Sequence, residues 1–293
     1  MDILKYGEIH KNPTCICLGY FDAIHLGHNK IISLAKEIAN KKGLKLSVLI
    51  FTGGKNNSPD IFTFEERLIK LKTLKVDTVI YQKLDSDFMG KSKDEFLNEI
   101  FNNYNVKSIV VGEDFTYGKF AEGNVYHLKQ FCDANNIELN VLSKVVDENG
   151  DKISSKDIKT ALLSGDIKTA NDFLGSNYFL RGEVVKGKNI GASLNFPTAN
   201  IICSENKLLI KDGVYLTCTV IDNKLYSCLT NVGKQPTVNG NNRVVETYIH
   251  NFSGDLYGKT LSVYFIERIR DIVKFDSLEE LKKQLTKDME YLK

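Results

Sequence analysis

The sequence predicts an α/β domain built on a parallel sheet, followed by a β-rich domain that ends in a helix. The first half of the chain alternates strand patterns with amphipathic helical patterns, which is typical of parallel strands joined by crossover helices. The second half contains short strand patterns separated by turn residues, which is typical of a closed barrel or a sandwich. The length of 293 residues corresponds to about two domains.

Apolar runs in the first half have the length and the residue types of buried strands. The helical patterns between them carry caps at their ends. Gly43 is suited to end the first helix, while Thr63 and Ser92 are each followed three residues later by a glutamate, which makes a capping box. The expected strands are residues 14–19, 44–51, 76–81, 107–112 and 137–143, and the expected helices include residues 26–42 and 124–136.

The pattern changes after Asn149-Gly150, which is a turn pair. Residues 154–175 predict two short helices, of which Ser154 or Ser155 caps the first and Ser164 or Asp166 caps the second. Turn pairs at Asp222-Asn223, Asn239-Gly240 and Ser253-Gly254 then separate strand patterns at residues 179–187, 213–222, 224–233, 243–252 and 261–269. An amphipathic helix at 278–292 begins after Ser277. We therefore expect a first domain at residues 1–178 and a second at 179–293.

The composition narrows the classes of protein to consider. The formal net charge of +2 supplies no basic field for nucleic acid, so an anionic substrate would have to be bound by local donors. The first residues do not have the pattern of a signal peptide, and no apolar run approaches the length of a membrane span. The six cysteines form no CxxC pair, which fits reduced thiols. We therefore expect a cytoplasmic protein that binds neither nucleic acid nor a membrane.

The sharpest local motif is the segment from Gly19 to His28, with the sequence GYFDAIHLGH, between the first strand and the first helix. His25 and His28 are three residues apart, so they are expected to share a helix face. The free N–H groups of a helix N-terminus suit phosphate, and Gly27 would let a ligand approach the backbone. Two imidazoles there could donate hydrogen bonds to ATP as charge develops on the leaving pyrophosphate.

Two other interpretations of this segment stay open. His25 and His28 could bind a metal ion together with Asp22, although no third histidine or cysteine lies nearby in the sequence. The two histidines could also be core residues whose polar atoms are satisfied inside the fold. Their position beside glycines at a strand-to-helix turn favours the phosphate interpretation.

The GYFDAIHLGH segment resembles the FAD synthetase module of bacterial bifunctional riboflavin kinase/FAD synthetases, because HxGH after the first strand is the mark of the nucleotidyltransferase superfamily. Three further segments resemble this family in the expected order: 110–118, 153–155 with the following helix, and 166–175. The resemblance implies a nucleotidyltransferase domain with a Rossmann-like parallel sheet, an FMN adenylyltransferase. It implies that His25 and His28 are catalytic, that ATP and its phosphates contact Gly19, Phe21, Asp22, Gly27, Ser154, Ser155 and Lys159, and that Gly112, Asp114, Phe115 and Gly118 form the flavin and adenine loop.

The first half also departs from the family pattern. Ala23 replaces a glycine, Lys156 and Lys159 replace a threonine and an arginine, and residues 51–60 do not match the family's proline-rich segment. Lys159 keeps a positive charge but lacks the planar fork with which an arginine binds phosphate. These departures predict adenylyl transfer that is slower than in a chain with the full motif.

In the second half, spaced glycines at positions 182, 187 and 191 lead into Asn195–Asn200, which contains the string PTAN. Glycines admit close approach to phosphates, and Thr and Asn supply hard oxygens for magnesium. Together with segments 231–237, 245–247, 255–258 and 270–275, this string resembles the riboflavin kinase family, although Ala192 and Asn195 depart from it. The resemblance implies a riboflavin-kinase-like antiparallel β-barrel with a terminal helix. It implies Glu246 as the catalytic base, Mg2+ on Thr198 and Asn200, and nucleotide contacts from Gly182, Gly187, Gly191, Pro197, Asn231 and Arg270.

The combined prediction is a bifunctional transferase. The second domain would phosphorylate riboflavin to FMN, and the first would adenylylate FMN to FAD, with ATP as co-substrate and Mg2+ as cofactor. Three alternatives remain: a riboflavin kinase with a weakened or inactive first domain, a flavin-binding regulator without activity, and a nucleotidyltransferase for another phosphate. The regulator needs no general base, and the last alternative leaves the second domain without a role.

Overall fold

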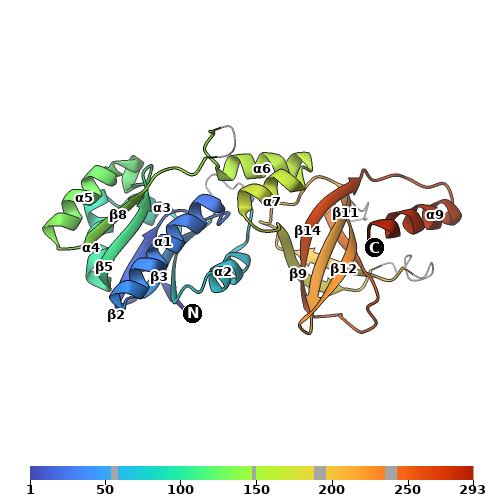
Figure 1. Cartoon of the computed structure of the whole chain (residues 1–293), viewed down its shortest axis with the longest axis horizontal. Coiled ribbons are helices and arrows are strands. Elements are labelled where there is room, and N and C mark those ends of the chain that lie inside the picture. The colour runs from blue at the N-terminus through green and yellow to red at the C-terminus, as the bar shows by residue number, and fades with distance from the viewer. Residues whose placement is uncertain (54–58, 147–149, 188–195, 235–242, 293) are drawn as a thin grey trace. The chain divides into compact units, whose positions relative to one another are not determined.

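The computed structural model describes residues 1–53, 59–146, 150–187, 196–234 and 243–292 (Figure 1). These residues form two compact units, Met1–Ser155 and Lys156–Lys293. The helical segment after Ser155 belongs to the second unit by its contacts, since the backbone N–H of Lys211 donates to the carbonyl of Leu162. The boundary of the two activities at residues 178 and 179 stays a prediction.

The first unit is built on a parallel sheet of six strands in the order β1-β4-β3-β2-β5-β8. All the strands expected from the sequence are present, and a short edge strand, β1, is added to them. Its side chains are mostly exposed, so it has no apolar run that the sequence could reveal. The strands are β1 (Asp2–Lys5), β2 (His10–Leu18), β3 (Lys45–Thr52), β4 (Thr78–Lys83), β5 (Tyr104–Gly112) and β8 (Glu138–Leu142).

Helices cover both faces of this sheet, so the first unit has the predicted Rossmann-like fold. Along β2 the buried side chains alternate: Ile16 and Leu18 face one core, whereas Cys15 and Cys17 face the other. The core of Ile16 and Leu18 is closed by α4 (Lys93–Asn103) and α5 (Val125–Ala134), and the opposite core by α1 (Leu26–Lys42) and α2 (Phe64–Thr73).

The predicted helix ends are confirmed. Thr63 and Ser92 form complete capping boxes with Glu66 and Glu95, and Gly43 ends α1 in the left-handed conformation with a φ of 65°. Each cap satisfies backbone groups that a helix end leaves without partners. The positions of the helices, and hence of the strand ends between them, are therefore fixed locally by the sequence.

The order of the strands places β2 and β5 side by side at the centre. From β2 the chain continues to β3 and β4 on one side, and it then crosses back to β5 and β8 on the other side. Ligands of open α/β sheets bind at such a switch point, outside the carboxyl ends of the strands. The segment that follows β5 forms a small antiparallel ribbon, β6 (Thr116–Tyr117) and β7 (Gly123–Asn124), around a 3-10 turn at Lys119–Ala121. A short helix, α3 (Ser86–Met89), precedes α4.

The second unit is a closed barrel of antiparallel strands in the order β10-β13-β12-β11-β14-β9, as the family resemblance implied (Figure 1). Two helices precede it, and Asp166 caps the second of them. Thr217, Thr230 and Thr247 lie inside the barrel, where their hydroxyls form a chain of hydrogen bonds of 2.7 and 2.9 Å. The elements are α6 (Ser155–Ser164), α7 (Ile167–Leu174), β9 (Phe179–Val185), β10 (Thr198–Cys203), β11 (Gly213–Ile221), β12 (Lys224–Lys234), β13 (Arg243–Ile249) and β14 (Thr260–Arg270).

The chain ends with α9 (Leu278–Asp288), which Ser277 caps as expected, and with a 3-10 turn at Met289–Leu292. The guanidinium of Arg270 donates two hydrogen bonds of 3.0 and 2.7 Å to the buried carboxylate of Asp288. Within the described residues, no helix is long and apolar enough to cross a membrane.

Candidate functional site

The turn between β2 and α1 carries unusual backbone geometry. Phe21 and Ile24 are fully buried, yet their φ angles are 47° and 46°, in the left-handed region that non-glycine residues seldom adopt. Such strain persists where the surrounding structure imposes it, and it clusters at ligand sites. A Cβ on Gly19 would lie 2.8 Å from the ring of Phe21, so this glycine makes room for the turn itself.

His25 and His28 lie together at this turn, but not as two residues of one helix. His25 is the N-cap of α1, in extended conformation, and its Nδ1 atom accepts a hydrogen bond of 3.1 Å from the N–H of Gly27. The two imidazole rings are stacked with centroids 3.9 Å apart. A Cβ on Gly27 would lie 3.0 Å from the His25 ring, so Gly27 serves the stack, whereas we expected it to admit a ligand.

Both histidines are neutral in the protein at pH 7. Burial lowers the pKa of His25 to about 4, against an opposing effect of the Asp22 carboxylate. Burial and the adjacent His25 hold the pKa of His28 well below its ordinary value. Because Nδ1 of His25 accepts a hydrogen bond, the proton of its neutral ring is on Nε2, which is therefore available as a donor.

Asp22 connects this turn to the first residue of α6. Its Oδ1 atom accepts hydrogen bonds from the Ser155 hydroxyl at 2.5 Å and from the N–H of Ala23 at 2.8 Å. Ser155 thus holds the turn in place, in addition to the phosphate contact predicted for it. Among the described residues, no group of three or more His, Cys, Asp or Glu side chains could hold a metal ion.

A cavity of about 690 Å³ opens at the carboxyl ends of β2 and β5. Its volume lies in the range of sites for small organic ligands. His28 lines it, whereas Asp22 and His25 lie outside its lining. The structure therefore brings together two segments that the sequence separates, and the predicted site residues among the lining are Gly19, Phe21, His28, Gly112, Asp114, Phe115 and Gly118.

Aromatic side chains that the sequence analysis did not identify complete the wall of the cavity. They come from the end of β3, from α3 and α4, and from the ribbon after β5; they are Phe51, Phe88, Phe96, Tyr117 and Phe120. Tyr117 belongs to the 110–118 segment, but the other four lie outside every motif that we identified, and only the fold brings them together. The buried Arg67 fixes one part of this wall, because its Nη1 atom donates a hydrogen bond of 2.7 Å to the carbonyl of Phe51.

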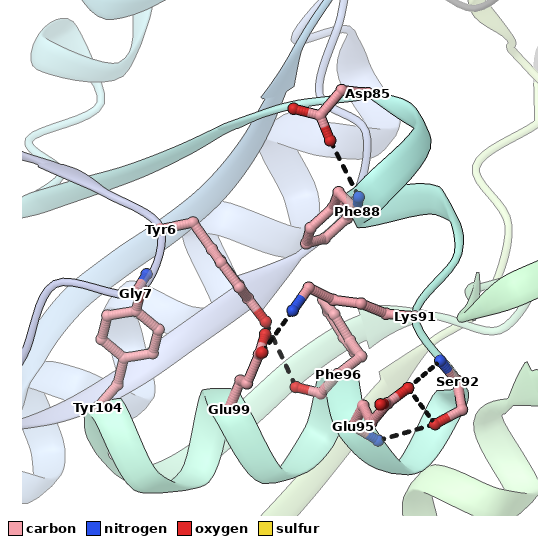
Figure 2. A network of polar contacts seen from close by, with 10 residues as sticks. All are labelled: Tyr6, Gly7, Asp85, Phe88, Lys91, Ser92, Glu95, Phe96, Glu99 and Tyr104. Carbon is pink, nitrogen blue, oxygen red and sulfur yellow. Dashed lines mark hydrogen bonds and ion pairs between the residues drawn. The ribbon is translucent and has the colours of Figure 1, made fainter.

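Figure 2 shows the network behind two of these rings. Lys91, which lines the cavity, forms an ion pair with Glu99, and the Tyr6 hydroxyl donates to the carbonyl of Phe96 at 3.5 Å. Burial, reinforced by Glu99, raises the pKa of Tyr6, so its hydroxyl stays protonated. The ring of Tyr6 packs edge-on against Phe88, with centroids 5.2 Å apart. These contacts therefore connect this side of the cavity to Tyr6 and Glu99 behind it.

In the barrel, three polar side chains occupy neighbouring strands at one level. Glu246 on β13 is opposite Asn200 on β10 and opposite Asn231 on β12. Residues that face each other across antiparallel strands project from the same side of the sheet. Their strand neighbours Val245 and Thr247 are buried inside the barrel, so this group lies on the outer face. The oxygen of the Asn231 side chain is buried and lacks a hydrogen-bond partner among the described residues.

Two of the predicted glycines are required by packing. A Cβ on Gly187 would lie 2.1 Å from Nδ2 of Asn200, so the backbone of Gly187 lies directly on this amide. A Cβ on Gly182 would lie 2.0 Å from the carbonyl oxygen of Ile202, so Gly182 allows β9 to cross β10 closely. The phosphate contacts expected of these glycines stay predictions.

The remaining predicted kinase residues are more dispersed. Thr198 is on β10 opposite Tyr248, and Pro197 precedes it at the surface. Arg270 is engaged by Asp288, as described above, and its nucleotide contact stays a prediction. Gly191 lies outside the described residues, as do residues 54–58 of the 51–60 segment. Lys159 lies on α6, in the second unit.

Comparisons with known proteins agree with both halves of this arrangement. The FAD synthetase family model matches residues 8–157, and the riboflavin kinase family model matches residues 174–293. A bifunctional riboflavin kinase/FMN adenylyltransferase of Bacillus subtilis is 32% identical, over 94% of this chain and 90% of the relative. One of Buchnera aphidicola (subspecies Acyrthosiphon pisum) is 34% identical, over 96% and 93%.

Among solved structures, a chain from Streptococcus pneumoniae titled as a macrolide-efflux protein has a TM-score of 0.89 and 32% identity, and the match covers 100% of this chain and 99% of that one. The matches to the bifunctional relatives cover 94% and 96% of this chain, so they include both units. The chain therefore belongs to the family of bifunctional riboflavin kinase/FMN adenylyltransferases.

Proposed function

We propose that the chain makes FMN from riboflavin at the barrel and FAD from FMN at the cavity of the α/β unit, with ATP as the second substrate of both reactions. As a member of its family it is a bifunctional transferase. The observation that carries the adenylyltransferase assignment is the aromatic cavity that meets His28 at the carboxyl ends of β2 and β5. The six cysteines are free thiols, which supports a cytoplasmic location.

In the adenylyl transfer, a phosphate oxygen of FMN attacks the α-phosphorus of ATP, and the bond to the β-phosphate breaks to release pyrophosphate. The attacking phosphate is already an anion, so no base is needed. What the protein must supply is alignment of two anions and donors for the leaving group. The neutral imidazoles at His25 and His28 are such donors, and the arriving phosphates raise their proton affinity because opposite charges favour the charged form.

The flavin ring fits the aromatic part of the cavity. Phe51, Phe88 and Phe96 give one side of it an apolar surface that matches a planar ring system. Lys91 lines the same side and offers a donor to ring carbonyl oxygens, while its pairing with Glu99 keeps its ammonium group in place. With the ring there, the phosphate end of FMN extends toward His28.

In the phosphorylation, the primary hydroxyl of riboflavin attacks the γ-phosphorus of ATP and ADP leaves. Glu246 is the group on this face that can take the hydroxyl proton. It is opposite Asn200 and Asn231 across the neighbouring strands, so the base lies beside the amides that position the phosphates.

The residues around Glu246 also fit Mg2+. Thr198 and Asn200 present hard oxygen atoms, and the buried Asn231 oxygen is an acceptor without a partner among the described residues. When bound, Mg2+ would neutralise charge on the phosphates. The loop at Gly187 holds the Asn200 amide in position.

The test follows each reaction separately. The protein is incubated with ATP and Mg2+ and with either riboflavin or FMN, and the flavin products are separated chromatographically. We expect FMN and FAD from riboflavin, and FAD from FMN. Glu246→Gln should lower FMN formation by roughly two to four orders of magnitude and leave FAD formation from FMN intact.

His28→Ala is the reciprocal variant. It should lower FAD formation by roughly two orders of magnitude, as loss of one transition-state donor does, and leave FMN formation intact. Wild-type protein that makes FMN but no FAD would contradict the assignment of the cavity and leave a kinase with an inactive first unit.

A further inference from the structure

The ribbon after β5, residues 116–124, carries one large apolar side chain that is exposed to solvent. We call this ribbon the flap. Phe120 at its tip is 93% exposed, the highest value among the large apolar side chains that the structure describes, and it lines the mouth of the cavity. Single exposed apolar residues are common on protein surfaces. Exposure alone therefore does not make Phe120 a functional residue.

The backbone at Phe120 gives the second observation. Phe120 and Ala121 have φ angles of 54° and 57°, two successive non-glycine residues in the left-handed region. Each such residue is strained, and the strain persists only where the surrounding structure imposes it. A relaxed turn at this point would turn the Phe120 ring elsewhere. The strained backbone of the flap therefore holds this ring at the mouth of the cavity.

The root of the flap is fixed firmly to α4 and to the segment before it. The N–H of Lys119 donates to the carbonyl of Lys91 at 2.7 Å, and the N–H of Lys93 donates to Glu122 at 2.8 Å. Gly118, with a φ of 74°, lies so close to this segment that a Cβ would be 2.7 Å from the backbone nitrogen of Lys93. The tip is therefore held by a rigid base, which imposes its strained conformation.

A side-chain relay fixes the inner wall of the same flap. The Tyr117 hydroxyl lies 2.7 Å from Nδ1 of His127, and Nε2 of His127 lies 3.1 Å from a carboxylate oxygen of Asp94. Gly123 packs against the Tyr117 ring, where a Cβ would lie only 2.6 Å from it. Tyr117 is buried in the cavity wall while Phe120, three residues later, is in solvent. The Tyr117 ring is thus already packed, whereas the Phe120 ring has the ammonium group of Lys119 5.2 Å from its centroid and is otherwise open to solvent.

We propose that Phe120 packs its ring on the isoalloxazine ring of FMN and thereby sets the affinity of the adenylyltransferase site for its flavin substrate. The inference rests on the proposed function of the cavity. Phe51, Phe88 and Phe96 form one contiguous group of rings in the cavity, with centroids 5.4 and 6.1 Å apart, and they can pack on one face of a planar ring while Phe120 lines the mouth. Phe120 covers the outer face, which removes its own exposed surface from water and shields the ring.

Steady-state kinetics of FAD formation from FMN test this contact. Stacking of a planar ring on an aromatic side chain changes affinity by roughly five- to a hundredfold, so Phe120→Ala should raise KM for FMN at least about fivefold. The value of kcat at saturating FMN should change little, since the ring is remote from the reacting phosphates. Phe120→Tyr should restore KM, and Phe120→Leu should not, because it is apolar but not planar. In every variant, KM for riboflavin in FMN formation is the internal control and should stay at the wild-type value.

A direct binding measurement uses the absence of tryptophan from the sequence. Phe120→Trp introduces a single indole, whose emission should be quenched when FMN is added without ATP. Tyr126→Trp is the matched control: Tyr126 is 73% exposed on α5, near the flap in sequence, but does not line the cavity. We expect stronger quenching at position 120 than at 126, with a midpoint equal to the dissociation constant of the α/β site.

An unchanged KM for FMN in Phe120→Ala, or equal quenching at positions 120 and 126, would overturn the proposal. His28→Ala, assayed beside these variants, separates this failure from failure of the proposed function. If His28→Ala abolishes FAD formation while Phe120→Ala leaves KM unchanged, the cavity is the active site and Phe120 has no part in it. If neither substitution affects FAD formation, the site itself is wrongly assigned, and the proposal falls with it.

Discussion

In the α/β unit most candidate residues of the sequence motifs lie in the segments that directly follow two strands, whereas in the barrel the candidate polar group lies along the strands themselves. The turn after β2 and the ribbon after β5 converge on one cavity because neighbouring parallel strands end at the same edge of the sheet. In the barrel, the register of three antiparallel strands sets Asn200, Glu246 and Asn231 side by side. The first site therefore depends on loop conformation and the second on strand register.

This difference predicts where each site is fragile. The α/β site stores backbone strain at Phe21, Ile24 and Phe120, and it should tolerate small displacements of the sheet but not relaxation of its turns. In the barrel, Asn200, Glu246 and Asn231 are aligned by the strand register, and Gly187 contacts the Asn200 amide. The substitutions below test this contrast, beginning with the largest expected effect.

Gly187→Ala should disable the kinase selectively. The new Cβ would lie 2.1 Å from Nδ2 of Asn200, so either the loop or the amide must move by about an ångström. A displacement of that size in a positioning group lowers rates roughly a hundredfold, and we expect this loss in FMN formation. FAD formation from FMN and the thermal midpoint of the chain are the controls. A Gly187→Ala protein with normal FMN formation would show that the Asn200 amide does not position the phosphates.

Much of the secondary structure that carries the two sites can be predicted from the sequence, because it depends on local signals. The capping boxes at Thr63 and Ser92, the left-handed Gly43 and the alternation along β2 are all decided within a few residues of chain. The Asp222-Asn223 turn is also confirmed, since both residues have positive φ angles of 50° and 63°. The GYFDAIHLGH turn is found at the predicted strand-to-helix junction for the same reason.

What the sequence could not predict depends on contacts between distant segments. Phe88 and Phe96 reach the cavity only because α3 and α4 pack beside the ribbon after β5. The spacing of His25 and His28 suggests a shared helix face, but His25 is an extended N-cap, and the rings meet by stacking. The glycines at 27, 182 and 187 make room for other atoms of the protein. A sequence motif cannot show whether a glycine makes room for the protein or for a ligand.

The pH dependence of stability should report on the histidine stack. The pKa of His25 is lowered by burial from 6.5 to about 4, so the unfolded chain binds this proton more readily than the folded chain. Stability is therefore intact above pH 6.5 and falls as the pH is lowered toward 4. Between pH 7 and pH 5, protonation of His25 should lower the free energy of unfolding by about 2 kcal/mol, which is a factor of roughly 30 in the folding constant.

His25→Asn is the matched variant, because asparagine is a good N-cap but does not titrate. Urea unfolding followed by circular dichroism at pH 7 and pH 5 should show a smaller loss of stability for the variant than for the wild type. The stacked His28 titrates in the same direction, so part of the pH dependence should remain. Equal slopes in the two proteins would show that His25 is not buried in the neutral form.

The smallest effect is expected from the relay of Tyr117, His127 and Asp94 behind the flap. This relay tests whether the α/β site depends on loop conformation. Tyr117→Phe and His127→Ala each break the hydrogen bond of 2.7 Å that holds the Tyr117 ring in the cavity wall. Each should raise KM for FMN in FAD formation by about three- to tenfold, since the lost hydrogen bond contributes roughly 1 kcal/mol to the geometry of the wall. His127→Gln can still accept from the tyrosine and donate to Asp94, so it should restore most of the affinity.

If the relay acts through this bond, the double variant Tyr117→Phe, His127→Ala should be no worse than Tyr117→Phe alone. Additive losses in the double variant would instead show that His127 stabilises α5 independently of the flap.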